Sequence, residues 1–235
     1  MLDRIQAGFE QQRRFVSDAS HELRTPVTVI RGYSDMLGRW GASDPETLSE
    51  GLIAIRSEAE DMQELIEKLL FLARADQKRL AMHKECLALA PLVEDVTKKM
   101  ALIATKHEVE LLANEPGTVY ADPVLMKHMM RIILENSMKY TPKGGRITVE
   151  LRRGAGEMLL SLADNGIGIA KEHQDKVFER FYRIDSSRTR GKDAPGGTGL
   201  GLSIARWIAE QHGIGIELIS DLGKGTKFIL HVPCV

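Results

Sequence analysis

The sequence predicts an α+β chain in two parts, a helical hairpin that forms a dimeric four-helix bundle followed by an α/β sandwich. Up to about residue 80, apolar residues recur at steps of three and four, the period of long paired helices. Beyond that point, short runs typical of strands mix with helical periods, and glycine-rich turns separate them. We therefore predict a dimerisation hairpin over residues 1–80, a linker over 81–86 and a second domain over 87–235.

Length and composition narrow the class of protein. A chain of 235 residues can bury the cores of two modest domains. Lys and Arg number 32 against 33 Asp and Glu, and a net charge of -1 argues against a nucleic-acid partner. Cys86 and Cys234 are far apart and have no zinc-ligand spacing, which favours a reducing compartment. No apolar run approaches the ~20 residues that cross a bilayer, so we expect a soluble, cytoplasmic chain.

Two helical patterns make up the hairpin, and a break at residues 38–45 separates them. Gly38 and the Asp44-Pro45 pair interrupt the first pattern, and Ser43 or Asp44 can cap the second helix. The first apolar seam contains Leu2, Ile5, Phe9, Val16, Ala19, Leu23, Ile30, Tyr33 and Leu37. The second contains Leu48, Leu52, Ile55, Ala59, Met62, Ile66, Leu69 and Ala73. A single hairpin cannot bury both seams, so we predict that it pairs with a second copy.

His21 is the most informative residue of the hairpin. It falls two residues past a seam position and therefore faces water. A solvated surface histidine is the ordinary explanation, but Glu22 is adjacent and Thr25 lies one turn on, along the same face. Pro26 removes the amide that would bond the Glu22 carbonyl, so we expect the helix to loosen or bend there. These neighbouring residues favour a functional role for His21.

The second domain is predicted to be a sheet covered by helices on one face. Helical patterns cover residues 91–105 and 123–140. Strand patterns cover residues 109–112, 146–151, 158–163, 214–219 and 227–232.

Four short blocks follow one another in this domain. They are Asn136 within residues 134–142, an Asp-Asn-Gly-Ile-Gly run at 164–168, the block 177–183 before a polar loop, and a glycine-rich run at 196–201. Each block alone has an ordinary explanation as a cap, a turn or a core residue. Their ordered occurrence in one domain favours a nucleotide site.

The residue types in these blocks suit a purine nucleotide with magnesium. Glycines at 196–201 let backbone amides approach phosphates, and a helix that begins near Leu202 adds its positive end. Asn136 offers a neutral oxygen to a hydrated Mg²⁺. Asp164 can accept a hydrogen bond from the exocyclic amine of a purine, while Gly166 and Gly168 leave room for the ring. Three basic side chains are candidates to neutralise phosphate charge: Lys139, Arg180 and Arg183.

The segment Phe-Val-Ser-Asp-Ala-Ser-His-Glu-Leu-Arg-Thr-Pro at 15–26 closely resembles the phosphoacceptor box of bacterial two-component sensor histidine kinases. The four later blocks resemble the N, G1, F and G2 boxes of the catalytic ATP-binding domain of that family. This domain has the GHKL fold of gyrase, MutL and heat-shock chaperone ATPases. Residues up to 14 resemble the exit of a HAMP linker, which implies the cytoplasmic output portion of an inner-membrane receptor, attached through preceding sensor and transmembrane segments.

The resemblance implies a role for each matching residue. Asn136 is the magnesium ligand, Asp164 contacts adenine, and Phe178 and Phe181 anchor a lid over residues 185–195. It implies ATP contacts at Lys139, Tyr140, Gly166, Gly168, Phe178, Arg183, Gly197, Thr198, Gly199, Leu200 and Gly201. The chain departs from the family at Ile132, where a second Asn is frequent, and in the run His-Gly-Ile-Gly at 212–215.

The implied function is ATP-dependent autophosphorylation of His21 and transfer of the phosphoryl group to an aspartate of a response regulator receiver domain. Glu22 would orient the His21 ring and take its proton, and Thr25 would direct water in the reverse, phosphatase reaction. Two other classes stay open. A GHKL-type conformational ATPase would form no covalent phosphate, which the exposed His-Glu pair argues against. A non-catalytic signalling scaffold would only bind nucleotide and regulator.

Overall fold

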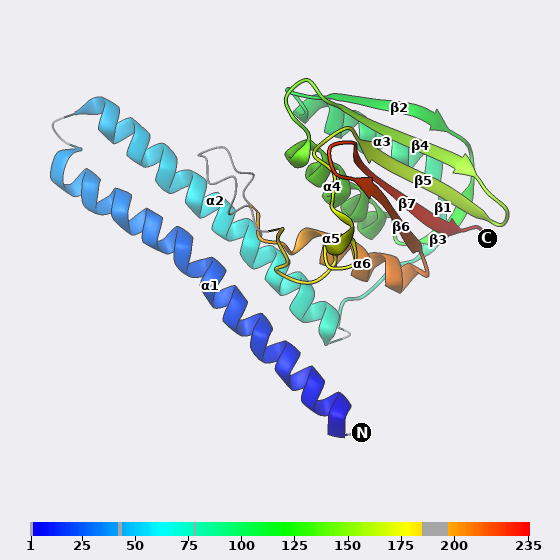
Figure 1. The fold of residues 1–235 in the computed structure, drawn as a ribbon, viewed down its shortest axis with the longest axis horizontal. Coiled ribbons are helices and arrows are strands. Elements are labelled where there is room, and N and C mark those ends of the chain that lie inside the picture. The colour runs from blue at the N-terminus through cyan, green and yellow to red at the C-terminus, as the bar shows by residue number, and fades with distance from the viewer. Residues whose placement is uncertain (1, 42–43, 78, 185–196) are drawn as a thin grey trace. The chain divides into compact units, whose positions relative to one another are not determined.

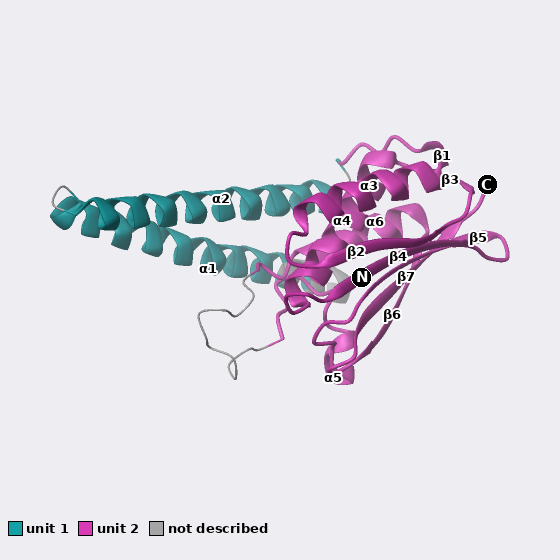
Figure 2. Cartoon of the chain, turned by 90° about the horizontal axis from the view of Figure 1, so that it is seen from above, with its two compact units in different colours: residues 1–79 teal, residues 80–235 magenta. Residues whose placement is uncertain are grey.

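The computed structural model describes residues 2–41, 44–77, 79–184 and 197–235. It divides into two compact units, residues 1–79 and 80–235, which Figure 2 colours separately. The first unit is entirely helical, and the second combines a sheet with helices (Figure 1). The predicted α+β class is therefore confirmed.

The first unit is a hairpin of helix α1 (Leu2–Trp40) and helix α2 (Pro45–Asp76). Asp44 caps α2, because its carboxylate accepts the Glu46 amide at 3.1 Å and the Thr47 hydroxyl at 2.5 Å. Ser43, the other predicted cap, lies outside the described residues. Helix α1 continues through Pro26 without a break, so the proline removes one amide donor and does not end the helix.

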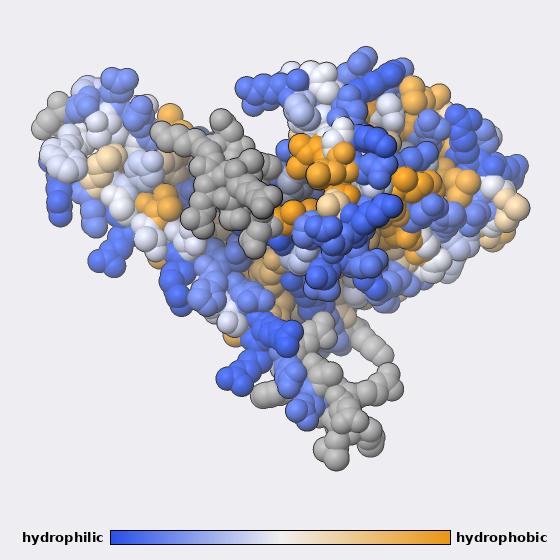
Figure 3. Space-filling model, viewed as in Figure 1, coloured by the Kyte–Doolittle hydropathy of each residue, from blue (hydrophilic) through white to orange (hydrophobic). Residues whose placement is uncertain are grey.

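The apolar seam predicted for α2 separates into two rows. Ile55, Met62 and Leu69 are partly covered within the hairpin, whereas Leu52 and Ile66 stay 54% and 42% exposed. Figure 3 shows uncovered apolar side chains among hydrophilic ones along the hairpin. One row of the seam is thus left without a partner in the single chain. Among the described helices, none combines the length and the apolar character that crossing a bilayer requires.

The second unit is built on a five-stranded sheet of order β2-β4-β5-β7-β6, in which only β2 and β4 pair in parallel. The strands are β2 (Glu108–Asn114), β4 (Arg146–Arg153), β5 (Glu157–Asp164), β6 (Gly215–Asp221) and β7 (Gly225–Pro233). Helices α3 (Leu89–Ile103), α4 (Pro123–Tyr140) and α6 (Gly201–His212) cover one face (Figure 1). Alternate residues of β5 are buried toward them, namely Met158, Leu160 and Leu162.

Three short elements were not predicted. Strand β1 (Glu85–Ala88) pairs with β3 (Thr118–Ala121), and helix α5 (Lys171–Gln174) follows the end of β5. Strand β1 begins inside the predicted linker over 81–86, which corrects that boundary. Each of these elements has only four residues, too few to show a hydrophobic period.

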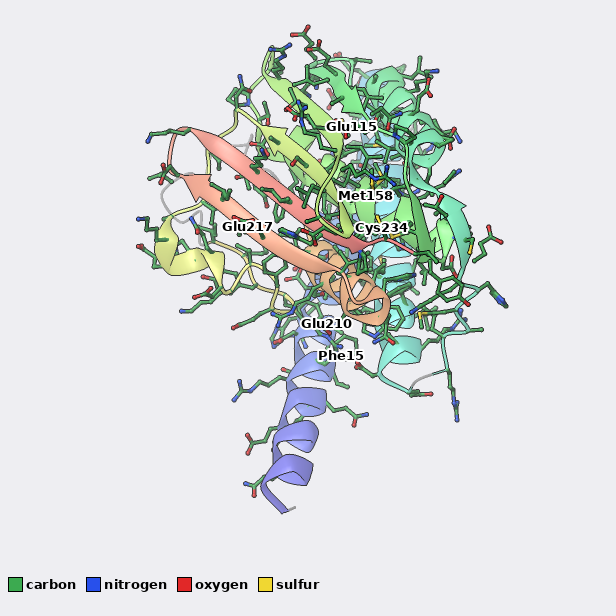
Figure 4. The ribbon with its side chains drawn as sticks, turned by 90° about the vertical axis from the view of Figure 1, so that its right-hand side faces the viewer. Phe15, Glu115, Met158, Glu210, Glu217 and Cys234 are labelled. Carbon is green, nitrogen blue, oxygen red and sulfur yellow. The ribbon has the colours of Figure 1, made fainter. Side chains whose placement is uncertain are left out.

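The open face of the sheet carries a histidine between two carboxylates. The His231 ring on β7 lies 3.1 Å from Glu157 on β5 and 3.4 Å from Glu217 on β6, the strand where Figure 4 labels Glu217. The hydrogen bond that the His231 ring donates to Glu157 raises the pKa of His231; burial opposes this rise, and the hydrogen bond to Glu217 adds to it. The protonated ring therefore ties three neighbouring strands together.

We predict that His231→Gln destabilises the second unit at about pH 5.5 and has little effect at about pH 9. The pKa of His231 is raised on folding from 6.5, so its contribution is complete below that value and is lost as the pH rises through the folded pKa. Thermal unfolding at both pH values measures the difference. The double variant Glu157→Gln/Glu217→Gln should lose the pH dependence, and an equal effect of His231→Gln at both pH values would contradict the charge argument.

Candidate active site

The His21 group lies on one helix of the first unit. His21 and Thr25 are exposed and Glu22 is partly buried on α1, as the predicted helical phase requires. The hydroxyls on either side of this group are turned back to their own helix, because Ser20 donates to the Val16 carbonyl and Thr28 donates to the Arg24 carbonyl. The imidazole of His21 is thus presented to solvent on a regular helix.

Asp164, the last residue of β5, is the best-defined polar group of the second unit. One carboxylate oxygen accepts the Ser137 hydroxyl at 3.0 Å. The other accepts the Gly166 amide at 3.0 Å and the Thr226 amide at 3.2 Å. Burial raises the pKa of Asp164, and these three hydrogen bonds oppose the rise without cancelling it. The carboxylate is held in one orientation and suits an amine donor such as that of adenine.

Ser137 and Thr226 were not among the predicted site residues. Ser137 is 2% exposed. The sequence signal that could have indicated Ser137 is a hydroxyl on the buried face of a helix, because such a group needs a hydrogen-bond partner. Thr226 contributes its backbone amide, which no side-chain pattern can indicate. The preceding Gly225 has φ of 93°, and a Cβ there would collide with the Asp164 carbonyl. Strand β7 therefore approaches Asp164 more closely than any other residue at 225 would allow.

Gly166 and Gly168 both lie close to neighbouring backbone. A Cβ on Gly166 would collide with the Tyr140 carbonyl, and a Cβ on Gly168 would collide with the Asp221 carbonyl. Gly168 also has φ of 68°, which favours glycine. These glycines let the turn after β5 pack against that backbone, and the expectation that they leave room for a purine ring stays a prediction.

The phosphate-binding residues expected from the sequence meet where α4 approaches the start of α6. A Cβ on Gly201 would lie 4.0 Å from the Asn136 amide nitrogen and 3.3 Å from an Ile132 methyl carbon. A Cβ on Gly197 would collide with the Lys139 ammonium, so this lysine lies directly against the loop. Leu200, the N-cap residue of α6, provides no side-chain cap for the amides of the first turn. Uncapped amides beside a lysine and an amide side chain fit the phosphates of a nucleotide.

The block at 177–183 is attached both to the sheet and to the glycine loop. The Phe178 ring meets Phe228 of β7 edge-on, with ring centroids 6.3 Å apart. The Phe181 amide donates to the Gly199 carbonyl at 3.0 Å, and Phe181 itself has φ of 60°. Phe178 thus packs against the sheet, while Phe181 holds the loop. The predicted lid at 185–195 and Gly196 lie outside the described residues.

Tyr140 lies beside two of the predicted basic groups. The Lys139 ammonium is 5.3 Å from the centroid of the Tyr140 ring. Burial raises the pKa of Tyr140, and the charge of Arg183 opposes this. Arg180 and Thr198 are partly buried in the same region of the chain. Two of the basic side chains expected at the phosphates, Lys139 and Arg183, therefore lie near Tyr140 at the end of α4.

The donor set fits magnesium held jointly with phosphates. Within the described part of the chain, no three His, Cys, Asp or Glu side chains gather as a metal site. The side-chain amide of Asn136 lies near the start of α6 and contains one oxygen that can bind a metal. Mg²⁺ keeps several waters and takes one or two protein ligands together with phosphate oxygens, so a single protein ligand is sufficient.

Both units match families of known proteins. Residues 11–78 match the family described as His Kinase A (phospho-acceptor) domain. Residues 121–235 match the family described as Histidine kinase-, DNA gyrase B-, and HSP90-like ATPase. Among curated relatives, the chain is 41% identical over 94% of its length to sensor histidine kinase YkoH of Bacillus subtilis and 34% identical over 97% to signal transduction histidine-protein kinase ArlS of Staphylococcus aureus. It covers 48% and 50% of those proteins, about half of their length.

Solved structures share the fold. The histidine kinase AdeS of Acinetobacter baumannii superposes with a TM-score of 0.70 at 22% identity, covering 91% of this chain and 98% of that one. The histidine kinase ThkA, crystallised in complex with the response regulator protein TrrA, superposes with a TM-score of 0.74 at 20% identity, covering 99% and 66%. The chain belongs to the bacterial two-component histidine kinases, with a phosphoacceptor hairpin and a GHKL-type catalytic domain.

We predict that Asp164→Asn weakens ATP binding about 10- to 100-fold, since a hydrogen bond to a charged group contributes about 1.5–3 kcal/mol. The same change should raise the midpoint of thermal unfolding at neutral pH. The pKa of Asp164 is raised on folding from 3.8, so the carboxylate form destabilises the fold once the pH exceeds its folded pKa. An Asn can keep all three hydrogen bonds, because its amide nitrogen can donate to Ser137. Calorimetric titration and thermal unfolding measure both effects.

Asp175→Asn is the matched control, because Asp175 is exposed in the same unit. It should change neither quantity. An Asp164→Asn chain that binds ATP as the wild type does would refute the assignment of adenine recognition to Asp164.

Proposed function

We propose that this chain is an ATP-dependent protein-histidine kinase that phosphorylates His21 and passes the phosphoryl group to an aspartate of a response regulator. One observation carries the proposal. The same chain presents an exposed His21 beside a partly buried Glu22 on a regular helix, and a partly buried, oriented carboxylate in a unit whose glycine loop fits a nucleotide. The family and the names of the curated relatives support the same activity.

The proposed reaction is an in-line displacement. A ring nitrogen of His21 forms the new N–P bond to the γ-phosphorus of ATP, the bond between that phosphorus and the β–γ bridging oxygen breaks, and ADP leaves. Glu22 orients the ring and accepts the proton that the imidazole loses, because only the neutral ring is nucleophilic. Magnesium at Asn136 would supply charge neutralisation at the phosphates. Lys139 and the amides at the start of α6 hold those phosphates in place.

The second step and its reverse use the same exposed face of α1. The phosphoryl group of His21 would pass to the aspartate of a docked receiver domain, a partner supported by the complex of ThkA with TrrA. Thr25 lies one turn from His21 on that face. Its hydroxyl would orient water toward the regulator phosphoaspartate in the phosphatase reaction.

We also propose a homodimer through the hairpin. The row that includes Leu52, Ala59 and Ile66 recurs every seven residues and stays exposed in the single chain. Two copies that pair these rows would form a four-helix bundle and bury them. The protein would act as the cytoplasmic output portion of a membrane receptor, which the similarity to about half of each curated relative supports.

His21→Ala should abolish the acid-labile, base-stable phosphate that the wild type acquires from labelled ATP, and leave ATP affinity within about twofold, because the acceptor and the nucleotide site lie in separate units. Ser17→Ala, an exposed change one turn earlier on α1, is the matched control and should incorporate phosphate normally. Phosphate retained by His21→Ala would refute the acceptor.

The same experiment separates the alternatives. ATP hydrolysis by the wild type without labelled protein would indicate a conformational ATPase. Binding of ATP with neither label nor hydrolysis would indicate a scaffold.

We predict that Leu52→Glu/Ile66→Glu shifts the wild-type dimer to monomer at micromolar concentration, since both side chains are exposed in the single chain and would be buried only between copies. Sedimentation equilibrium measures the change. Glu60→Gln, an exposed change on the same helix, should leave the dimer intact. A wild-type chain that sediments as a monomer would contradict the bundle.

A further inference from the structure

The first residues of the second unit are fastened to two helix ends by hydrogen bonds. The His83 amide donates to an Asp122 carboxylate oxygen at 2.8 Å, and the Lys84 ammonium donates to the Gln211 carbonyl at 2.7 Å. Asp122 precedes α4, and Gln211 lies in the last turn of α6. We call His83, Lys84, Asp122, Gln211 and His212 the linker clamp. Through it, the segment that leaves the hairpin at Arg79 is tied to both helices of the nucleotide site.

Asp122 and His212 join the two helices to each other. One Asp122 carboxylate oxygen caps α4 by accepting the Val124 amide at 2.9 Å and the Leu125 amide at 3.1 Å. The backbone amide of Asp122 donates to Nε2 of His212 at 3.0 Å. Asp122 is 5% exposed and His212 is 8% exposed, so these bonds are shielded from water. The start of α4 is thereby fixed to the end of α6.

The partners of His212 determine its tautomer. Its Nδ1 lies 2.7 Å from the Ile208 carbonyl, which can only accept, so Nδ1 carries the proton and Nε2 accepts from Asp122. Burial lowers the pKa of His212, and the neutral ring is the form that this arrangement requires. The ring is therefore a fixed, uncharged spacer between the two helices.

The clamp lies at the opposite ends of α4 and α6 from the phosphate residues. Helix α4 starts at Pro123 and carries Asn136 near its other end, while α6 starts at Gly201 and ends at His212. The two helices pack against each other along their length. A change in their relative position at the clamp therefore changes how Asn136 faces the start of α6.

The linker is attached to the ends of α4 and α6 by hydrogen bonds, and a groove lies beside it. A groove of about 310 Å³ separates part of the linker from the start of α4, with Leu80, His83 and Val124 among its lining residues. Individual hydrogen bonds contribute modestly to stability, so this segment can be released without unfolding the unit.

We propose that the linker clamp couples the attachment of residues 83–84 to nucleotide affinity, with Lys84 and His212 as positioning residues for ATP. This inference rests on the proposed ATP-binding function. The attached linker holds α4 and α6 in the arrangement that binds nucleotide. Because coupling is reciprocal, nucleotide must in turn hold the linker in place.

The test uses the full chain with magnesium and a non-hydrolysable ATP analogue. His212→Leu removes the acceptor for Asp122 and should weaken binding about tenfold, whereas Lys84→Met should weaken it about threefold. His212→Gln keeps an acceptor oxygen and should restore affinity to within about twofold of the wild type. Lys98→Met is the matched control, because Lys98 pairs with Glu94 on the exposed face of α3, and it should bind normally. In the wild type, the analogue should slow hydrogen exchange of the His83 amide about tenfold, and this effect should shrink in Lys84→Met.

Two outcomes are distinguishable. Wild-type affinity in Lys84→Met and His212→Leu, with no effect of the analogue on the His83 amide, would overturn the clamp even if His212→Leu lowers the thermal midpoint. If His212→Leu does not fold, Lys84→Met and the exchange measurement decide the matter, because Lys84 is partly exposed. A wild-type chain that does not bind the analogue would instead overturn the proposed function.

Discussion

The partly buried carboxylate of Asp164 is the polar group around which helix, turn and sheet of the second unit are arranged. Its three hydrogen-bond donors come from α4, from the turn after β5 and from β7. A carboxylate shielded from water is costly unless such donors surround it. The oriented charge therefore exists only when helix, turn and sheet have all assembled, so the position of this carboxylate depends on the fold of the unit. Because folding raises the pKa of Asp164, the ionised carboxylate lowers the stability of the unit at neutral pH.

Helices α4 and α6 carry the other half of the site, and their contact is apolar where polar residues are frequent in the family. Ile132 is 4% exposed, and its methyl carbon lies against Gly201. Van der Waals contact holds the helices close but specifies their rotation weakly, because it has no direction. Directional bonds occur instead at the far ends, between Asp122 and His212. Because Ile132 stands where an Asn is frequent in the family, the proposed linker clamp would contribute more to fixing the rotation of α4 and α6 in this chain.

Long periodic segments could be predicted from the sequence, whereas contacts through the backbone could not. The predicted helix at 123–140 has the bounds of α4, and the five predicted strands are all present. Strands β1 and β3 were missed because four residues show no period. The close approach of neighbouring backbone to Gly166 and Gly168 could not be predicted either, because it depends on how the turn after β5 packs. The hydrogen bond of the Thr226 amide could not be predicted, because it depends on the backbone and on no property of a side chain.

The helical period of the hairpin determines which residues lie on each face of its two helices. The row with Ile55, Met62 and Leu69 is partly covered in the single chain, and the row with Leu52 and Ile66 would be covered in the proposed dimer. On α1, the face left uncovered by such packing carries His21, as the proposed transfer of a phosphoryl group from ATP to a receiver domain requires. The proline at 26 can occur one turn from Glu22 because its buried ring takes part in packing, and the helix does not depend on each backbone bond. The arrangement that would bury the apolar rows therefore leaves His21 exposed.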